Sequence, residues 1–367
     1  MTGIDEPALS NRLIPEDRRR GRGARTNVSG RFEARIREEF DDGWDVLKSL
    51  DSFKTRIHTD TSRTIITTNA SPDISFDRSI NPYRGCEHGC IYCYARPTHC
   101  YLGHSAGLDF ETQLYVKPEA ARLLERELAN PRYHIRTMAL GTNTDPYQPI
   151  ERNLKITRSV LEVLAATNHP VGIVTKSALV TRDIDILAPM AAKGLAKVAL
   201  SLTTLDRKLA RAMEPRAATP PKRLEALRQL SDAGIPTVVM VAPVIPGLTD
   251  HEIEAILEAA RNAGVNEAGY VMLRMPHEIK ELFREWLETE YPDRASRVIK
   301  LMQSMHGGSD YNPEFGIRQR GTGPYADQIA MRFRLALQRL GLGKPRQPLR
   351  TDLFRPPALP GSQLSLF

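Results

Sequence analysis

Short runs of β-branched residues alternate with amphipathic segments, several of which end in glycine, between residues 133 and 275. Such alternation is typical of βα units around a parallel sheet. The strand-like runs are mostly apolar, as in a sheet covered by helices, and right-handed crossovers favour a barrel or part-barrel of about six units. The predicted strands are 133–141, 171–177, 197–204, 236–244 and 267–275, and the predicted helices are 157–167, 182–194, 221–234 and 250–264.

The flanking segments divide the chain into four parts. Residues 1–60 lack sustained periodicity, apart from one candidate helix at 31–50, and are predicted to form a basic, largely irregular arm. The barrel is expected over 61–275, a helical and glycine-rich extension over 276–344, and a flexible proline-rich linker with a terminal peptide over 345–367. The hydrophobic content of 41% in 367 residues allows one large core or two modest ones.

Membrane insertion is not expected, because no stretch approaches the ~20 consecutive apolar residues that a spanning helix needs. The N-terminus also lacks the apolar run of a secretory signal. We therefore expect a cytoplasmic protein with no membrane partner. Since the cytosol keeps thiols reduced, metal binding or catalysis is a better use for the cysteines than disulfides.

All four cysteines of the chain lie in the stretch "INPYRGCEHGCIYCYARPTHC", residues 80–100. Cys86, Cys90 and Cys93 have the spacing C-x3-C-x2-C and directly follow a predicted first strand. Loops at the carboxyl ends of barrel strands are where active sites collect. Three thiolates on a short loop suit a 4Fe-4S cluster that leaves one iron open for chemistry.

A zinc site is the alternative for the same cysteines. Structural zinc is closed by four ligands, so a fourth would have to come from His88, His99 or Cys100. This hypothesis describes a zinc-stabilised nucleic-acid-binding module without catalysis. Colour separates the two, because an iron–sulfur protein is brown and a zinc protein is colourless.

The cysteine spacing, the aromatic Tyr92 before the third cysteine and the position after a first strand resemble the radical S-adenosylmethionine (SAM) superfamily. In that family the cysteines hold a 4Fe-4S cluster whose open iron chelates SAM, and electron transfer yields a 5'-deoxyadenosyl radical that abstracts hydrogen. The resemblance implies a partial (β/α)6 barrel over about residues 76–275. It also implies an electron donor such as flavodoxin or ferredoxin.

Within the superfamily, the chain resembles spore photoproduct lyase and its uncharacterised relatives. The matching motifs are "CIYCY" (90–94), "TNTD" (142–145), "VTK" (174–176), "LSLTT" (200–204), "MEPR" (213–216) and "VVMVAPVIPG" (238–247). The resemblance implies that Asn143, Thr144, Lys176 and Ser201 contact SAM. Lys176 would offer a positive charge to the methionine carboxylate, and the hydroxyls would bond to ribose or carboxylate.

The same resemblance points to residues that transfer hydrogen. Tyr92 and Tyr94 match two tyrosines proposed to relay the radical in the lyase. The lyase carries a cysteine hydrogen donor where this chain has Thr142, so repair of spore photoproduct itself is left open. Cys100 is either a displaced thiol donor or a small buried hydrophobic residue.

Arginines are concentrated near the N-terminus, with nine between Arg12 and Arg37 against only Glu16, Asp17 and Glu33. The densest part is "RRRGRGAR", residues 18–25. Arginine binds phosphate bidentately, so such an arm suits a nucleic-acid backbone. The alternative is a soluble tail without a partner.

The chain ends "QLSLF", which resembles the Q-L-x-L-F peptide that docks bacterial polymerases and repair proteins on the DNA sliding clamp. In that mode Gln363 enters a polar pocket, while Leu364, Leu366 and Phe367 fill apolar ones. The alternative is a chain end tucked against the barrel.

Together these features predict a radical SAM enzyme that acts on DNA, in photoproduct-lyase-like repair or modification, and is recruited by the sliding clamp. A second hypothesis keeps the cofactors but makes RNA, protein or a small molecule the substrate. Whether "RQRGTGPY", residues 318–325, lines the substrate cavity or forms only a surface turn is left open by the sequence.

Overall fold

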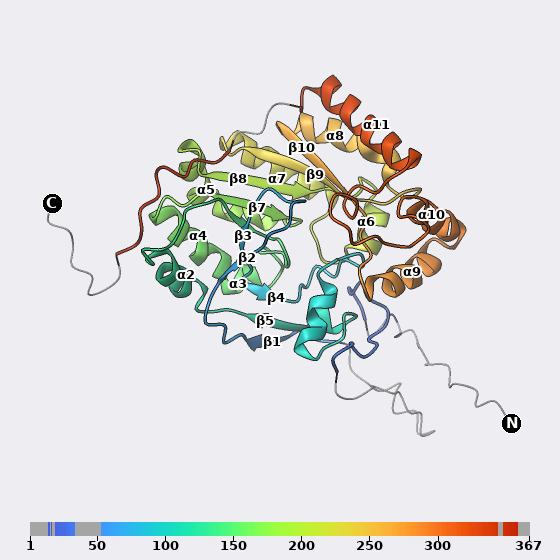
Figure 1. Ribbon diagram of the computed structural model, residues 1–367, viewed down its shortest axis with the longest axis horizontal. Helices are drawn as coiled ribbons and strands as arrows, with labels where there is room; N and C mark the ends of the chain where they lie inside the picture. Colours follow the sequence, from blue (N-terminus) through green and yellow to red (C-terminus); the bar gives the residue numbers. More distant parts are fainter. Residues whose placement is uncertain (1–13, 15, 17–18, 34–52, 344–347, 359–367) are drawn as a thin grey trace.

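The computed structural model describes residues 14, 16, 19–33, 53–343 and 348–358 (Figure 1). Its main sheet has seven strands in the order β10-β9-β8-β7-β6-β3-β2. All neighbours are parallel except β2 and β3, so six strands run in one direction and the predicted parallel α/β sheet is confirmed. The strands are β2 Ile66–Thr68, β3 Arg78–Ile80, β6 Met138–Leu140, β7 Val171–Thr175, β8 Ala196–Ser201, β9 Thr237–Val244 and β10 Glu267–Met272.

Four helices follow the strands β6 to β9 and pack on the sheet to form the main core. Their buried residues repeat at helical spacing, as Leu161 and Leu164 do in α4. Gly194 and Gly234, just after α5 and α7, have φ of 73° and 74°, a left-handed conformation that glycine adopts at no steric cost. The helices are α4 Ile156–Ala166, α5 Ile184–Ala192, α7 Pro220–Asp232 and α8 Ile253–Asn262, close to their predicted positions.

The predicted helical C-terminal extension is also confirmed. Its last helix lies against α8, where Arg332 pairs with Glu254, and the ring centroids of Phe333 and Tyr270 are 4.7 Å apart. Figure 1 shows these helices in orange and red at one side of the sheet. They are α9 Ile279–Glu290, α10 Pro292–Ser304 and α11 Pro324–Leu340.

A second, three-stranded sheet in the order β1-β5-β4 was not anticipated from the sequence. Its strands come from three separate segments and are too short to give a periodic signal. The cysteine loop lies between two of them. The strands of this sheet are β1 Arg56–Thr59, β4 Tyr83–Arg84 and β5 Gln113–Val116. Two short helices lie within the cysteine loop: η2 Arg96–Leu102 and α1 Asp109–Thr112. The remaining short helices of the described chain are α2 Ala120–Leu128, α3 Glu151–Leu154, η3 Ala178–Asp183, α6 Arg207–Met213 and η4 Asp250–Glu252.

The described part of the predicted linker, residues 348–358, runs beside α5 (Figure 1). The backbone N–H of Arg350 donates to the carbonyl of Gly194 at 2.9 Å, and that of Arg355 to Thr167 at 2.9 Å. Both acceptors precede strands of the main sheet, so this segment lies at the end of the sheet where strands begin. The predicted peptide at 363–367 and most of the candidate helix at 31–50 fall outside the described residues. None of the helices described is long and apolar enough to span a bilayer.

Candidate active site at the cysteine loop

The three cysteines follow β4 on a loop held by backbone hydrogen bonds. The N–H of Cys86 donates to the carbonyl of Phe110 at 2.9 Å, and that of Cys93 to Cys90 at 3.2 Å. Cys86 and Cys90 are buried, and Cys93 is partly exposed. Burial raises the pKa of all three thiols, that of Cys90 to about 12. Thiolates are the metal-binding form, so the positive charge of a bound metal must offset the unfavourable burial of these negative charges.

The donor set fits an iron–sulfur cluster better than a single zinc ion. Electrostatic interaction with Cys90 and Cys93 contributes to the raised pKa of Cys86, so the three thiols are neighbours. A structural zinc ion is closed by four ligands, whereas three thiolates on one loop suit a 4Fe-4S cluster that leaves one iron open.

The three candidates for a fourth zinc ligand have other partners. His88 Nδ1 lies 3.3 Å from Asp145 Oδ2, and His99 Nε2 lies 2.9 Å from the carbonyl of Gln113. Cys100 is fully buried in an apolar cluster. Burial is the main cause of the raised pKa of its thiol, and the Glu278 carboxylate raises this pKa further. The same buried cluster contains Cys90 and Tyr92, and the role of Cys100 as a thiol donor stays a prediction.

Lys176 and Tyr92 meet beside the cysteines. Lys176 follows β7, and its Nζ lies 5.7 Å from the Tyr92 ring centroid. Its charge lowers the pKa of Cys90, against the larger effect of burial. A cation in this position can attract an anionic ligand at the cluster, as the SAM-binding prediction requires.

A buried carboxylate that the sequence analysis did not single out organises this side of the site. Glu214 accepts hydrogen bonds from the Tyr92 hydroxyl and from Thr203 Oγ1, the latter at 2.7 Å, and pairs with Arg223. Burial alone would raise the pKa of Glu214, but Arg223 and Lys176 bring it below its usual value. Tyr92 is thus fixed by its hydroxyl. Glu214 lies in the "MEPR" motif, but the sequence carries no sign of its pairing with Arg223.

The other predicted SAM contacts lie on neighbouring strand ends. Ser201 ends β8, is buried, and its carbonyl accepts from Arg223 Nη1 at 2.9 Å. Thr144 Oγ1 donates to the carbonyl of Tyr83 at 2.9 Å, and the N–H of Asn143 donates to Asn81 Oδ1 at 3.1 Å. These bonds fix the backbone around each residue. Their contact with SAM stays a prediction.

Asp145 joins the cysteine loop to the ends of β6 and β7. Its carboxylate accepts from Thr175 Oγ1 at 2.7 Å and from the N–H of Lys176 at 2.8 Å, and it faces His88 of the cysteine loop. Burial opposes ionisation, but His88 and these hydrogen bonds lower the pKa of Asp145 to about 2. An ionised Asp145 therefore positions Lys176. The quoted "TNTD" motif contains this residue, but its role depends on a contact with another loop.

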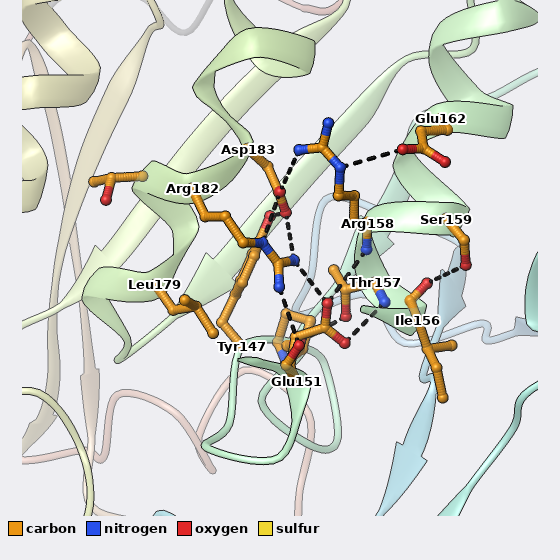
Figure 2. Close-up of polar contacts among 12 residues, drawn as sticks. Tyr147, Glu151, Ile156, Thr157, Arg158, Ser159, Glu162, Leu179, Arg182 and Asp183 are labelled. Carbon is orange, nitrogen blue, oxygen red and sulfur yellow. Dashed lines mark hydrogen bonds and ion pairs between the residues drawn. The ribbon is translucent and has the colours of Figure 1, made fainter. Parts of the chain in front are cut away.

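A buried ionic network holds the loops after β6 and β7 together (Figure 2). Arg182 Nη2 contacts Glu151 at 2.7 Å and Asp183 at 2.8 Å, and Arg158 Nη1 contacts Asp183 at 2.9 Å. Both carboxylates are fully buried, so the two arginines provide the compensation that buried charges need. The Tyr147 hydroxyl also donates to Asp183, at 3.1 Å. The network therefore fixes the elements that carry Asp145 and Lys176.

Tyr94 contacts residues that follow two separate strands of the main sheet, β6 and β10. Its hydroxyl donates to the carbonyl of Thr142, after β6, and the Arg274 guanidinium, after β10, lies 4.8 Å from its ring centroid. Arg274 Nη2 in turn lies 3.3 Å from the Tyr311 hydroxyl. Tyr94 is 44% exposed, so a ligand can reach its ring.

The glycine-rich segment after α10 connects the two edges of the main sheet. The N–H of Met272, in β10, donates to the carbonyl of Gln319 at 2.9 Å. Arg318 pairs with Asp73 in the turn between β2 and β3, and Arg274 also lowers the pKa of Asp73. Residues 318 and 319 are therefore bonded to both edges of the sheet, and their place in a substrate cavity stays a prediction.

Replacing Lys176 with Ala should weaken SAM binding without loss of the cluster, because the cysteines lie on another loop. A charge-assisted bond to a carboxylate contributes roughly 1.5 to 3 kcal/mol, or about ten- to a hundredfold in affinity. Isothermal titration of the anaerobic protein measures this change. Lys222→Ala, at an exposed site on α7, is the matched control. An unchanged dissociation constant in Lys176→Ala would remove Lys176 from the SAM site.

Known proteins are similar to this chain in sequence or in fold. Residues 80–287 match the model of the radical SAM superfamily. An uncharacterised protein of Mycobacterium tuberculosis (strain H37Rv) is 38% identical over 230 residues, 62% of this chain and 68% of that protein. An uncharacterised protein of Methanocaldococcus jannaschii is 28% identical over 215 residues, 58% and 76% of the two chains. Spore photoproduct lyase complexed with dinucleoside spore photoproduct superposes with a TM-score of 0.55 at 16% identity, covering 83% of this chain and 85% of that one.

Proposed function

The chain belongs to the radical SAM superfamily, and on this premise we propose that it acts on DNA, in a repair or modification reaction similar to that of photoproduct lyase. Enzymes of this family bind a 4Fe-4S cluster and SAM and need an electron donor. When bound, the cluster supplies the electron that cleaves SAM. Cys86, Cys90 and Cys93 would hold it, and Lys176 would orient SAM beside it.

Two exposed aromatic rings, each paired with an arginine, carry the proposal for a nucleic-acid substrate. Arg274 lies 4.8 Å from the ring of Tyr94, and Arg318 lies 4.4 Å from that of Phe315. The two rings are 44% and 55% exposed. Both arginines lower the pKa of Asp73, so the two ring–arginine pairs lie near each other. Exposed rings stack on bases, which suits a flipped or single-stranded nucleotide.

Binding and turnover test this proposal. Stacking on one base contributes about 1 to 3 kcal/mol, so Tyr94→Ala should weaken binding of a single-stranded DNA oligonucleotide roughly five- to a hundredfold. Tyr101→Ala, at a 70% exposed ring outside the site, should bind normally. Anaerobic turnover with SAM on UV-irradiated and unirradiated DNA, followed by mass spectrometry, should show a DNA product. Turnover on RNA or a peptide but not on DNA would favour the second hypothesis.

We also propose that the C-terminal peptide recruits the enzyme to the bacterial sliding clamp through Gln363, Leu364, Leu366 and Phe367. The preceding residues 348–358 lie where the strands begin, away from the cysteine loop, which leaves the site accessible. A short peptide with few anchors should bind in the micromolar range. Changing Leu366 and Phe367 to Ala should abolish binding to purified clamp but not turnover on a short oligonucleotide. Unfolding of this double variant would assign the peptide to the fold.

A further inference from the structure

Residues 22–31 of the N-terminal segment lie directly on the cysteine loop. Glu111, a fully buried residue of α1, is the point of attachment. Its carboxylate accepts from the N–H of Gly23 at 2.9 Å and from that of Ala24 at 2.8 Å, and its carbonyl accepts from Arg22 Nη1 at 2.8 Å. A segment predicted to be an arm is thus bonded to the interior.

Glu111 also connects this segment to the backbone of a cysteine. Its Oε1 accepts from Arg96 Nη2 at 2.6 Å, and both side chains are fully buried. Arg96 Nε donates to the carbonyl of Cys90 at 2.9 Å, and its Nη1 donates to the carbonyl of Gly107 at 2.9 Å. One ion pair therefore links the N-terminal segment, Cys90 and the far end of the loop.

Glycines allow the two backbones to touch. A Cβ on Gly23 would lie 1.8 Å from the carbonyl oxygen of Gly89, which stands between Cys86 and Cys90. A Cβ on Gly107 would lie 2.3 Å from the carbonyl oxygen of Thr26. Any larger residue at either position would push the segment off the loop.

The outer side of the segment is bonded to α9. Arg25 pairs with Glu290, and Thr26 Oγ1 donates to Glu285 at 3.1 Å. Arg22 and Arg25 are only 7% and 8% exposed, so these two arginines are unavailable to DNA phosphates. The basic run that predicted a nucleic-acid contact is used, in this part, to attach the segment to the protein.

We propose that residues 22–31 are a strap that holds the cysteine loop in the shape that receives the 4Fe-4S cluster, with Glu111 as its positioning residue. The strap touches the loop backbone at Gly89 and, through Arg96, at Cys90. It therefore restricts the opening of the loop through which a cluster exposed to oxygen or a chelator loses iron. This inference rests on the family's cluster and is independent of the substrate.

Two variants separate the strap from the loop. Gly23→Ala places a Cβ against Gly89, and Glu111→Gln replaces the partner of Arg96 with an uncharged group of the same size. Gly343→Ala is the matched glycine control, since the nearest atom to a Cβ placed there is 4.0 Å away. Arg20→Ala is the control for an exposed arginine of the run at residues 18–25.

The readouts are the iron content per chain and the decay of absorbance at about 400 nm after a chelator is added. Thermal unfolding of the iron-free proteins is measured in parallel. We expect both strap variants to lose iron several-fold faster than wild type, and both controls to behave as wild type. Wild-type iron retention in Glu111→Gln and Gly23→Ala would overturn the proposal. Iron loss that is equally fast in Arg20→Ala would also overturn the proposal. If Gly23→Ala fails to fold, Glu111→Gln and Arg25→Gln, which releases the α9 end, decide the matter. None of these readouts depends on DNA.

Discussion

Replacing Cys86, Cys90 or Cys93 with Ala should abolish stable binding of the 4Fe-4S cluster. The loop supplies three thiolates, and a cluster held by two leaves an additional iron exposed and labile. Each single variant should therefore be colourless after anaerobic reconstitution and contain little iron. Colorimetric iron analysis and the visible spectrum measure this.

Cys100→Ala is the internal control for these variants. Cys100 is buried near Glu278 and is not one of the three predicted ligands, so its removal should leave iron content unchanged. A colourless Cys100→Ala together with a brown Cys93→Ala would show that the ligand assignment is wrong. Tightly bound zinc in place of iron would instead revive the hypothesis of a structural zinc module.

Replacing Arg223 with Met should reduce the free energy of unfolding by about 3 to 5 kcal/mol, because it leaves Glu214 charged and buried without its partner. Both side chains are almost completely buried. Arg223 also donates to the carbonyls of Ser201 and Ala218, and these bonds would be lost. Urea unfolding of the iron-free protein measures the change.

Helix α7 provides the matched control for this variant. Arg228 pairs with Glu225 at 3.0 Å on the exposed face, where both side chains are about half exposed. Solvent screens such a pair, so Arg228→Met should change stability by only about 0 to 1 kcal/mol. Equal effects of the two substitutions would mean that Glu214 takes up a proton or finds water, and that the buried pair does not organise the Tyr92 side of the site.

Several features of this protein were determined by the sequence alone. The main sheet and its covering helices lie close to the predicted positions, because strand and helix periodicity are properties of contiguous residues. The cysteine spacing is equally local, since all three thiols belong to one loop. The family's motifs at strand ends placed Lys176 and Ser201 at one end of a parallel sheet, where consecutive strands must finish together.

Only the tertiary structure decided which distant residues would be paired. Arg22 looked like part of a DNA-binding run, but it is bonded to Glu111, 89 positions along the chain. Tyr92 meets Glu214 at a separation of 122 residues, and the β1-β5-β4 sheet joins three segments too short to be recognised individually. A charged residue looks the same in sequence whether it is solvated or buried. Its role depends on the partner that the topology brings to it, because burial without such a partner is too costly to persist.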